Sequence, residues 1–121
     1  MAATMLPPSI DNTRRVRCAP AIPVVYAEGT RTVVALQGET DASDEPVLCN
    51  ILSPVIASGA GDVVIDLTAV TFIDTGTVRV LATAHHLLDR QGRNLIFRSP
   101  SRLALRLIGM FGLAGRIEIS V

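Results

Sequence analysis

The segment FIDTGTVRVL, residues 72–81, places a carboxylate and two hydroxyls around a glycine, in the order Asp74, Thr75, Gly76, Thr77. β-type residues precede these four and a helical pattern follows, so they are expected at the start of a helix. The first N–H groups of a helix lack intrahelical partners and carry partial positive charge, which favours an anion there. Two chemistries fit. Either Asp74 or Thr75 caps the helix, contributing about 1 kcal/mol, or a hydroxyl accepts a phosphoryl group, adding about −1.5 to −2 charges at pH 7.

The helix that follows is predicted to be amphipathic. At 100° per residue, one half of it carries Val80, Leu81, Ala84, Leu87 and Leu88, and the other half carries Arg79, Thr83, His86, Asp89 and Arg90. Thr77 falls on the apolar half, whereas a cap side chain at Thr75 is expected to stay exposed. Thr75 is therefore the better candidate for modification. Arg79, His86 and Arg90 either contact a partner with an acidic surface or form a solvated helix face.

The elements that must position this helix alternate along the chain. Residues 22–27 and 31–38 are β-rich runs separated by EGT, which predicts a hairpin. Residues 62–67 form a short, β-branched run typical of a central parallel strand, and residues 94–99 and 116–121 predict two further strands.

Two more helices are expected between these strands. Residues 40–59 predict a helix capped by Ser43 or Asp44, with Pro46 near its first position and Pro54 bending or shortening its last turn. Its apolar positions are Val47, Leu48, Ile51, Leu52, Val55 and Ile56. Residues 99–112 predict a helix with Ser99 as cap and Pro100 at the first position. The order β-β-α-β-α-β-α-β implies an α/β fold with a mixed sheet and helices packed against it.

Composition limits the partners. The 121 residues predict a flexible arm over residues 1–21, which lack periodicity, and one domain over residues 22–121. Eleven arginines balance eleven acids, so there is no basic excess for binding nucleic acid. The sequence has neither an apolar run near the roughly 18 residues that span a bilayer nor a secretory signal, which predicts a cytoplasmic protein without membrane contact.

Catalytic and metal motifs are missing from the sequence. His85 and His86 are neighbours that diverge by 100° on a helix, and no HxxxH pattern or nearby Cys completes a metal site. There is no GxSxG, GxxxxGK[ST] or GxGxxG motif either. Cys18 and Cys49 have no ligand spacing and are read as reduced thiols, with a redox pair as the alternative. We therefore expect no enzyme, no cofactor and no metal.

Three segments together resemble one known family. GETDAS after the second strand, VVIDLTAVTFIDTGTVRVL in the middle and SPSRLALRLIGMFGL near the end resemble the signature regions of STAS domains, specifically bacterial anti-sigma-factor antagonists. The resemblance spans about residues 22–121. It implies a sheet covered on one side by helices. It also implies transcription regulation by partner switching, in which the domain binds a nucleotide-bound anti-sigma factor of the serine-protein kinase type and releases a sigma factor.

The family's phosphoacceptor does not carry over. The family reads Asp-Ser-Ser-Gly at this helix start, with the second Ser as acceptor; here Asp74 matches the Asp, Thr75 the first Ser and Gly76 the acceptor. Moving a hydroxyl by one residue rotates it by about 100°, so Thr75 or Thr77 is a poor replacement. Weak or absent phosphorylation is expected.

Glu39 and Asp41 in GETD also match the family. The resemblance implies that Asp41 helps to form the partner-binding face; the alternative is an acid that shapes the turn into the helix, and the two roles can coexist. The alternative to an antagonist is a sensor that holds a small ligand or anion at the Gly76 helix terminus without a kinase. Exposed edge strands and the high apolar fraction also favour a homodimer.

Overall fold

The computed structural model describes residues 23–113 and 117–118. Its elements are β1 (Val24–Glu28), β2 (Arg31–Glu39), α2 (Asp44–Ala57), β3 (Val63–Phe72), α3 (Thr75–Asp89), β4 (Leu95–Arg98), α4 (Arg102–Met110) and β5 (Ile117–Glu118). This confirms the predicted order of strands and helices. The arm predicted for residues 1–21 lies outside the described residues.

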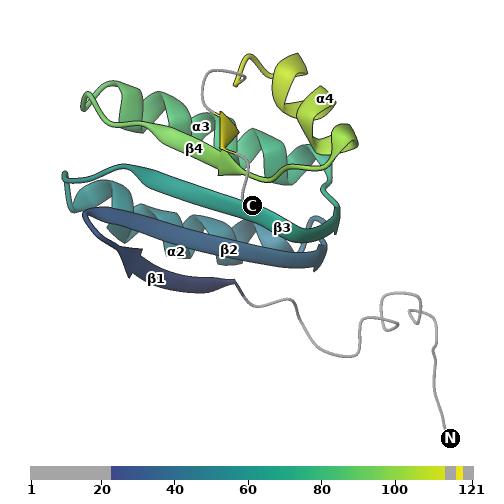
Figure 1. Cartoon of the computed structure of the whole chain (residues 1–121), viewed down its shortest axis with the longest axis horizontal. Coiled ribbons are helices and arrows are strands. Elements are labelled where there is room, and N and C mark those ends of the chain that lie inside the picture. Colours follow the sequence, from purple (N-terminus) through teal and green to yellow (C-terminus); the bar gives the residue numbers. More distant parts are fainter. Residues whose placement is uncertain (1–22, 114–116, 119–121) are drawn as a thin grey trace, which may run out of the picture.

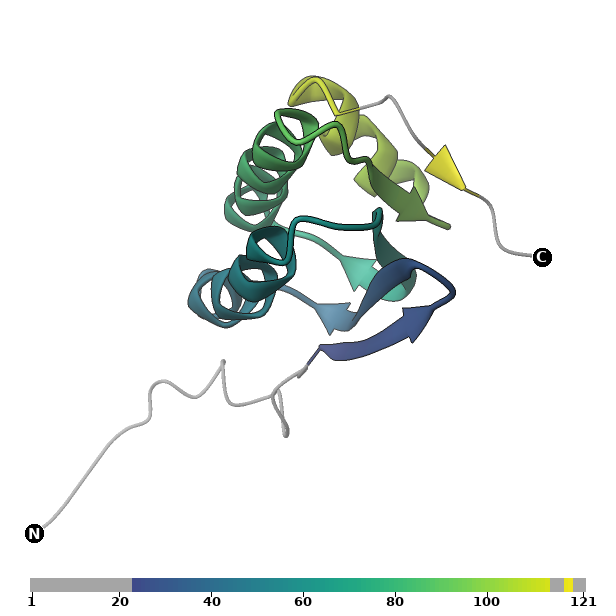
Figure 2. The same cartoon turned by 90° about the vertical axis from the view of Figure 1, so that its left-hand side faces the viewer.

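One mixed sheet organises the chain, with strand order β1-β2-β3-β4-β5. β1 pairs antiparallel to β2 through the predicted hairpin, and all other neighbours are parallel. The two views show α2 and α3 side by side against one face of the sheet (Figures 1 and 2). Because β2 and β3 are parallel, their carboxyl ends meet at one edge, and there α2 and α3 begin.

The main core lies between the sheet and the helices. Val34, Leu36, Ile65, Leu67 and Phe97 from the strands are buried together with helix residues, including Leu48, Leu52, Leu81, Leu88 and Ile108. The alternation of side chains along a strand sends Val33, Val64 and Ile96 to the opposite face, where they form a second, small cluster. Apolar residues therefore occupy both faces of the central strands, as the nearly continuous run at residues 62–67 predicts.

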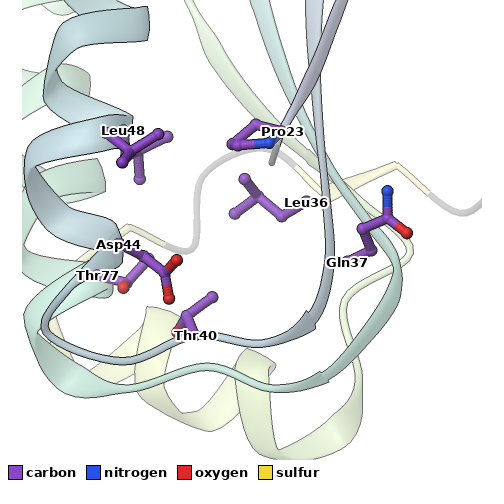
Figure 3. A pocket seen from close by; sticks show the side chains of 8 residues that line it. Pro23, Leu36, Gln37, Thr40, Asp44, Leu48 and Thr77 are labelled. Carbon is purple, nitrogen blue, oxygen red and sulfur yellow. The ribbon is translucent and has the colours of Figure 1, made fainter. Parts of the chain in front are cut away.

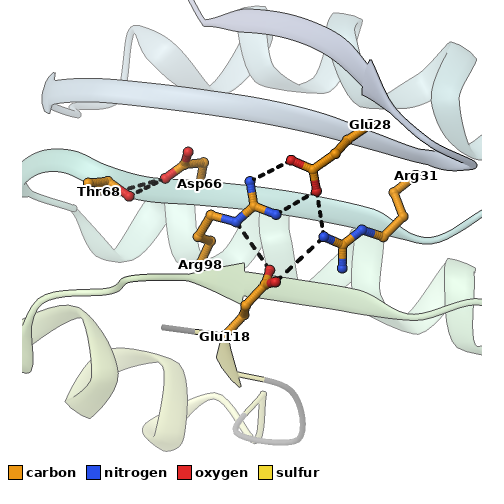
Figure 4. A network of polar contacts seen from close by, with 6 residues as sticks. All are labelled: Glu28, Arg31, Asp66, Thr68, Arg98 and Glu118. Atoms are coloured by element: carbon orange, nitrogen blue, oxygen red, sulfur yellow. Dashed lines mark hydrogen bonds and ion pairs between the residues drawn. The ribbon is translucent and has the colours of Figure 1, made fainter. Parts of the chain in front are cut away.

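An ion network lies on the face without helices (Figure 4). Arg98 on β4 reaches Glu28 on β1 at 2.7 Å and Glu118 on β5 at 3.1 Å, and Arg31 contacts the same two carboxylates. Hydrogen bonds from Arg98 and Arg31 lower the pKa of Glu28 to about 2.

A buried arginine holds the end of α2. The side chain of Arg93 is 6% exposed and donates hydrogen bonds to carbonyl oxygens at the end of that helix and in the turn after it. These acceptors are Val55, Ile56, Ala60 and Gly61. The last carbonyls of a helix lack the usual intrahelical partners, and Arg93 adds a charged donor there to those from Gly59 N and Ser58 Oγ. Pro54 lies inside α2, which continues beyond it to Ala57.

Two details of the predicted helices are wrong. The cap of α4 is Ser101, whose Oγ accepts from Ala104 N at 3.1 Å. Ser99 has a φ of 50° and donates its N–H to Glu118 O, so it lies in the loop after β4 and extends the pairing with β5. Pro100 precedes the cap and does not occupy the predicted first position of the helix. Leu87, expected in the core, is 39% exposed because it stands at the outer edge of the α2–α3 contact.

Candidate functional site

The site is built where β2 and β3 end. Glu39 and Phe72, the last residues of the two strands, are register partners, and Thr40 N donates to Phe72 O at 3.0 Å. This pairing brings the loop before α2 against the loop before α3. Residues more than thirty positions apart in the sequence therefore share one edge of the sheet.

Asp74 is the centre of the polar contacts at this edge. Thr40 Oγ1 and Thr77 Oγ1 both donate to Asp74 Oδ1 at 2.5 Å, and Thr77 N donates to Asp74 Oδ2 at 3.4 Å. Asp74 N in turn donates to Thr40 Oγ1. Burial would raise the pKa of Asp74, but these hydrogen bonds outweigh it and hold the pKa below its usual value. Asp74 is thus the N-cap of α3, which confirms the capping role predicted for Asp74 or Thr75.

The two threonines have opposite environments. Thr75 is exposed, whereas Thr77 is 1% exposed and its hydroxyl is engaged by Asp74. A kinase must reach the oxygen that it phosphorylates, so in this conformation Thr77 cannot serve as acceptor. Thr75 remains the accessible hydroxyl at the start of α3.

Gly76 has a neighbour that the sequence did not reveal. A Cβ built on Gly76 would lie 2.8 Å from Cδ of Glu45, and Glu45 Oε2 would be closer still. Glu45 belongs to the first turn of α2, and its carboxylate fills the space that a serine side chain would need at position 76. The acceptor position thus lacks its hydroxyl and is also covered by a negatively charged group.

The acids before α2 shape a turn. Asp41 Oδ1 accepts from Ser43 N at 2.9 Å and from Ser43 Oγ at 2.5 Å, while Asp41 N donates to Asp44 Oδ2. Asp41 therefore has the predicted turn-forming role. Ser43 occupies the N-cap position of α2, yet its side chain makes no capping hydrogen bond because it is turned toward Asp41.

The remaining predicted contacts lie along α3. Arg79, His86 and Arg90 are all exposed. Arg79 lies one turn beyond Thr75, whereas His86 lies eleven residues along the helix, about 16 Å away. The structure therefore brings Glu39, Asp41, Asp74, Thr75, Gly76 and Arg79 to one end of the molecule and leaves His86 and Arg90 toward the other.

Sequence reasoning missed two residues at this end. Thr40 is 6% exposed and orients Asp74. Phe72, 45% exposed, is a large apolar side chain beside Glu39. The alternation along β3 could have indicated Phe72 as outward-facing, but nothing local to Thr40 pointed to a partner 34 residues away.

Two hollows adjoin these helices. The first lies at the site and is lined by Pro23, Leu36, Gln37, Thr40, Asp44, Val47, Leu48 and Thr77 (Figure 3). Its volume of about 10 Å³ is close to the minimum for a single water molecule. The second, of about 160 Å³, lies between α2 and α3 and is lined by Cys49, Leu52, Ser53, Ile56, Val80, Thr83, Ala84 and Leu87.

Metal and membrane features are missing from residues 23–113 and 117–118. No three His, Cys, Asp or Glu side chains gather there as ligands for a metal ion. None of the helices within those ranges combines the length and apolar character needed to cross a bilayer. Cys49 is an exposed thiol, and Cys18 lies outside the described residues, so their pairing stays untested.

The family follows from the whole arrangement. A family model described as "Mlab, STAS domain" matches residues 24–119. The chain belongs to the STAS domain family. No relative was found among curated proteins.

Solved structures agree with this assignment. The anti-sigma factor antagonist SpoIIAA in its unphosphorylated form is similar with a TM-score of 0.72 and 18% identity, covering 82% of this chain and 88% of that chain. An anti-sigma factor antagonist from Mycobacterium paratuberculosis is 28% identical, with a TM-score of 0.65 and coverage of 84% and 87%. RsbS from Moorella thermoacetica has a TM-score of 0.68 and 21% identity, with coverage of 82% and 87%. The predicted STAS fold, a mixed sheet with helices on one side, is confirmed.

Proposed function

We propose that this STAS domain is an anti-sigma-factor antagonist: a binding module, not an enzyme, that releases a sigma factor by occupying a nucleotide-bound anti-sigma factor of the serine-protein kinase type. The observation that carries the proposal is the surface at the start of α3. Thr75 and Phe72 are exposed there, acids flank them, and the adjoining hollow is too small for a ligand. A surface with an exposed aromatic anchor and a rim of charges fits a protein partner.

Phosphorylation is not the proposed control of this surface. The acceptor position is Gly76, the Glu45 carboxylate covers it, and Thr77 is buried. Two antagonists among the similar structures support the general class.

Binding to the anti-sigma factors of the source organism tests the proposal. The purified protein should form a stable complex with one of them or displace its sigma factor. Phe72→Ala and Arg79→Glu should each weaken that complex at least tenfold, with a smaller effect for His86→Ala. Arg106→Glu, an exposed arginine on α4, is the matched control and should leave affinity unchanged. Absence of binding across the complete set would overturn the proposal.

The hollow between α2 and α3 favours a second candidate function. The hollow has a volume of about 160 Å³ and is open to solvent, since Cys49, Ser53, Thr83 and Leu87 in its lining are exposed. A small apolar ligand could be sensed there, away from the helix terminus where a ligand site was predicted. Titration with benzene should then shift the NMR signals of Val80 and Leu87 selectively; unchanged signals would remove this candidate.

A further inference from the structure

One edge of the described sheet is open. β1 is the outermost strand, and within residues 23–113 and 117–118 no strand pairs with its outer side. Val24, Val25 and Tyr26 of this strand are 50%, 45% and 42% exposed. Successive side chains of a strand point to opposite faces, so apolar surface is exposed on both faces of this edge. Such an edge is a template for a further strand.

β1 lacks the features that usually protect an edge strand from pairing. Its sequence, VVYAE, contains no cation and no proline, and its register with β2 runs from Val24 to Glu28 without a bulge. Glu28 is its one charged residue, and Arg31 and Arg98 bind that carboxylate on the face without helices (Figure 4). No unpaired charge on β1 therefore opposes a second strand.

The hairpin determines which backbone groups of β1 are free. Its loop has two residues, and the first of them, Gly29, has a φ of 64°, as in a type II′ turn. In such a hairpin the residues that flank the loop are a hydrogen-bonded pair, and bonded pairs alternate from there along the strand. Every second residue, starting from Glu28, therefore bonds to β2. The N–H and C=O groups of the residues between them, Val25 and Ala27, point outward.

These outward groups fit a second copy of the same strand. When two copies of β1 run antiparallel about a twofold axis, one register pairs all five residues of each strand, and it is centred on Tyr26. Val25 of each copy then lies opposite Ala27 of the other, so their outward N–H and C=O groups bond to each other. A centre at Val25 would instead pair Ala27 with Pro23, which has no N–H to donate.

The side chains agree with this register. Tyr26 pairs with Val33 of β2, so it lies on the face without helices, and the two Tyr26 rings face each other across the axis. Glu28 lies opposite Val24 of the second copy, so no like charges oppose each other. Aromatic cross-strand pairs stabilise antiparallel strands, whereas like charges directly opposite destabilise them.

We propose that two copies of this chain associate through β1, which joins their sheets into one ten-stranded sheet with the helices of both copies on the same face. The contact is weak, because β1 supplies five residues, whereas a standard protein interface takes about 20–30 residues from each side. The dimer is therefore populated at high protein concentration and dissociates on dilution. It requires no partner of another kind, so it is independent of the proposed function.

Disulfide cross-linking tests the register. At the axis the two Tyr26 Cα atoms form a non-hydrogen-bonded pair about 4.5 Å apart, within the roughly 4.4–6.8 Å that a disulfide spans. Tyr26→Cys, in a chain whose Cys18 and Cys49 are replaced by Ser, should therefore oxidise to a covalent dimer. Val24→Cys is the matched control, because the two Val24 residues lie about 14 Å apart in this register and should cross-link at least tenfold more slowly. Equal rates for the two variants would overturn the proposal.

A charge at the axis tests the association without cross-linking. Sedimentation velocity of the native chain should show an average mass that rises toward that of a dimer as the protein concentration rises. Tyr26→Lys places two like charges opposite each other and should keep the chain monomeric at the same concentrations. Leu103→Lys, at a residue on α4 that is 47% exposed, adds the same charge elsewhere and should leave the association unchanged. A native chain that stays monomeric at every concentration would contradict the proposal, as would a dimer that persists in Tyr26→Lys.

Discussion

The carboxylate of Glu45, in the first turn of α2, occupies the space in which a side chain on Gly76 would begin. The two residues come from different helices and lie 31 positions apart in the sequence. Because the nearby Glu45 atoms are the far end of a flexible side chain, a side chain at position 76 would displace the Glu45 carboxylate. A substitution at either position therefore alters the effect that a substitution at the other has on the free energy of unfolding.

A double-mutant cycle should reveal this coupling. Ala is favoured over Gly in a helix by about 0.5–1 kcal/mol, so Gly76→Ala should stabilise the domain by that amount when Glu45 is also replaced by Ala. With Glu45 present, displacement of its carboxylate should reduce the gain. Urea unfolding of the four proteins measures the coupling, expected at about 0.5 kcal/mol or more.

Gly109→Ala is the control for that cycle. Gly109 lies in α4, and a Cβ there would meet nothing within 4 Å. This substitution should stabilise the native chain and the Glu45→Ala variant by the same amount. If Gly76→Ala behaves in the same way as Gly109→Ala, Glu45 does not restrict position 76.

Phosphotransfer should depend on both residues. With an anti-sigma kinase that binds the domain and ATP, the native chain should incorporate little or no phosphate, and Gly76→Ser alone should gain little. Gly76→Ser with Glu45→Ala should be phosphorylated at least tenfold faster, because the new hydroxyl is then uncovered. Mass spectrometry locates the phosphate; stoichiometric modification of native Thr75 or Thr77 would contradict this expectation.

Acid should weaken the Asp74 contacts. The folded state lowers the pKa of Asp74, so its ionised form stabilises the domain above the unfolded-state pKa of about 4, and this contribution is lost as pH falls further. Asp74→Asn removes one acceptor of the cap and should cost about 1 kcal/mol at pH 7. Its unfolding free energy, measured from pH 6 to pH 2, should fall less steeply than that of the native protein; parallel curves would refute this.

Arg93 should be among the most sensitive positions for stability. Replacement by Met leaves the carbonyls of Val55, Ile56, Ala60 and Gly61 without their charged donor, and should cost more than about 2 kcal/mol. Lys cannot reproduce the forked geometry and should recover only part of the loss. Arg90→Ala, at an exposed position, should change the free energy of unfolding by less than about 0.5 kcal/mol.

The sequence predicted the elements well because their signals are local. Alternation, helical periodicity and turn residues gave the order of strands and helices, and the apolar half of α3 correctly included Leu81, Ala84 and Leu88. The cap of α4 was misplaced because Ser99 and Ser101 carry the same local signal. The structure separates them through two contacts, Ser99 N with Glu118 O and Ala104 N with Ser101 Oγ.

The site was predicted less completely because its decisive contacts are long-range. Thr40 meets Asp74 across 34 residues, and Arg93 meets Val55 across 38. Pairing of β2 with β3 creates the first contact, and no periodic pattern encodes it. The exposure of Leu87 could not be predicted from the sequence either, because it depends on how closely α2 approaches α3.

Arg98 forms ion pairs with Glu28 on β1 and with Glu118 on β5 at the same time. Local unfolding of either edge strand therefore removes one partner of Arg98 and destabilises its contact with the other edge strand. The described part of β5, residues 117–118, is thereby linked to the hairpin 90 positions earlier, so the two edge strands should open together.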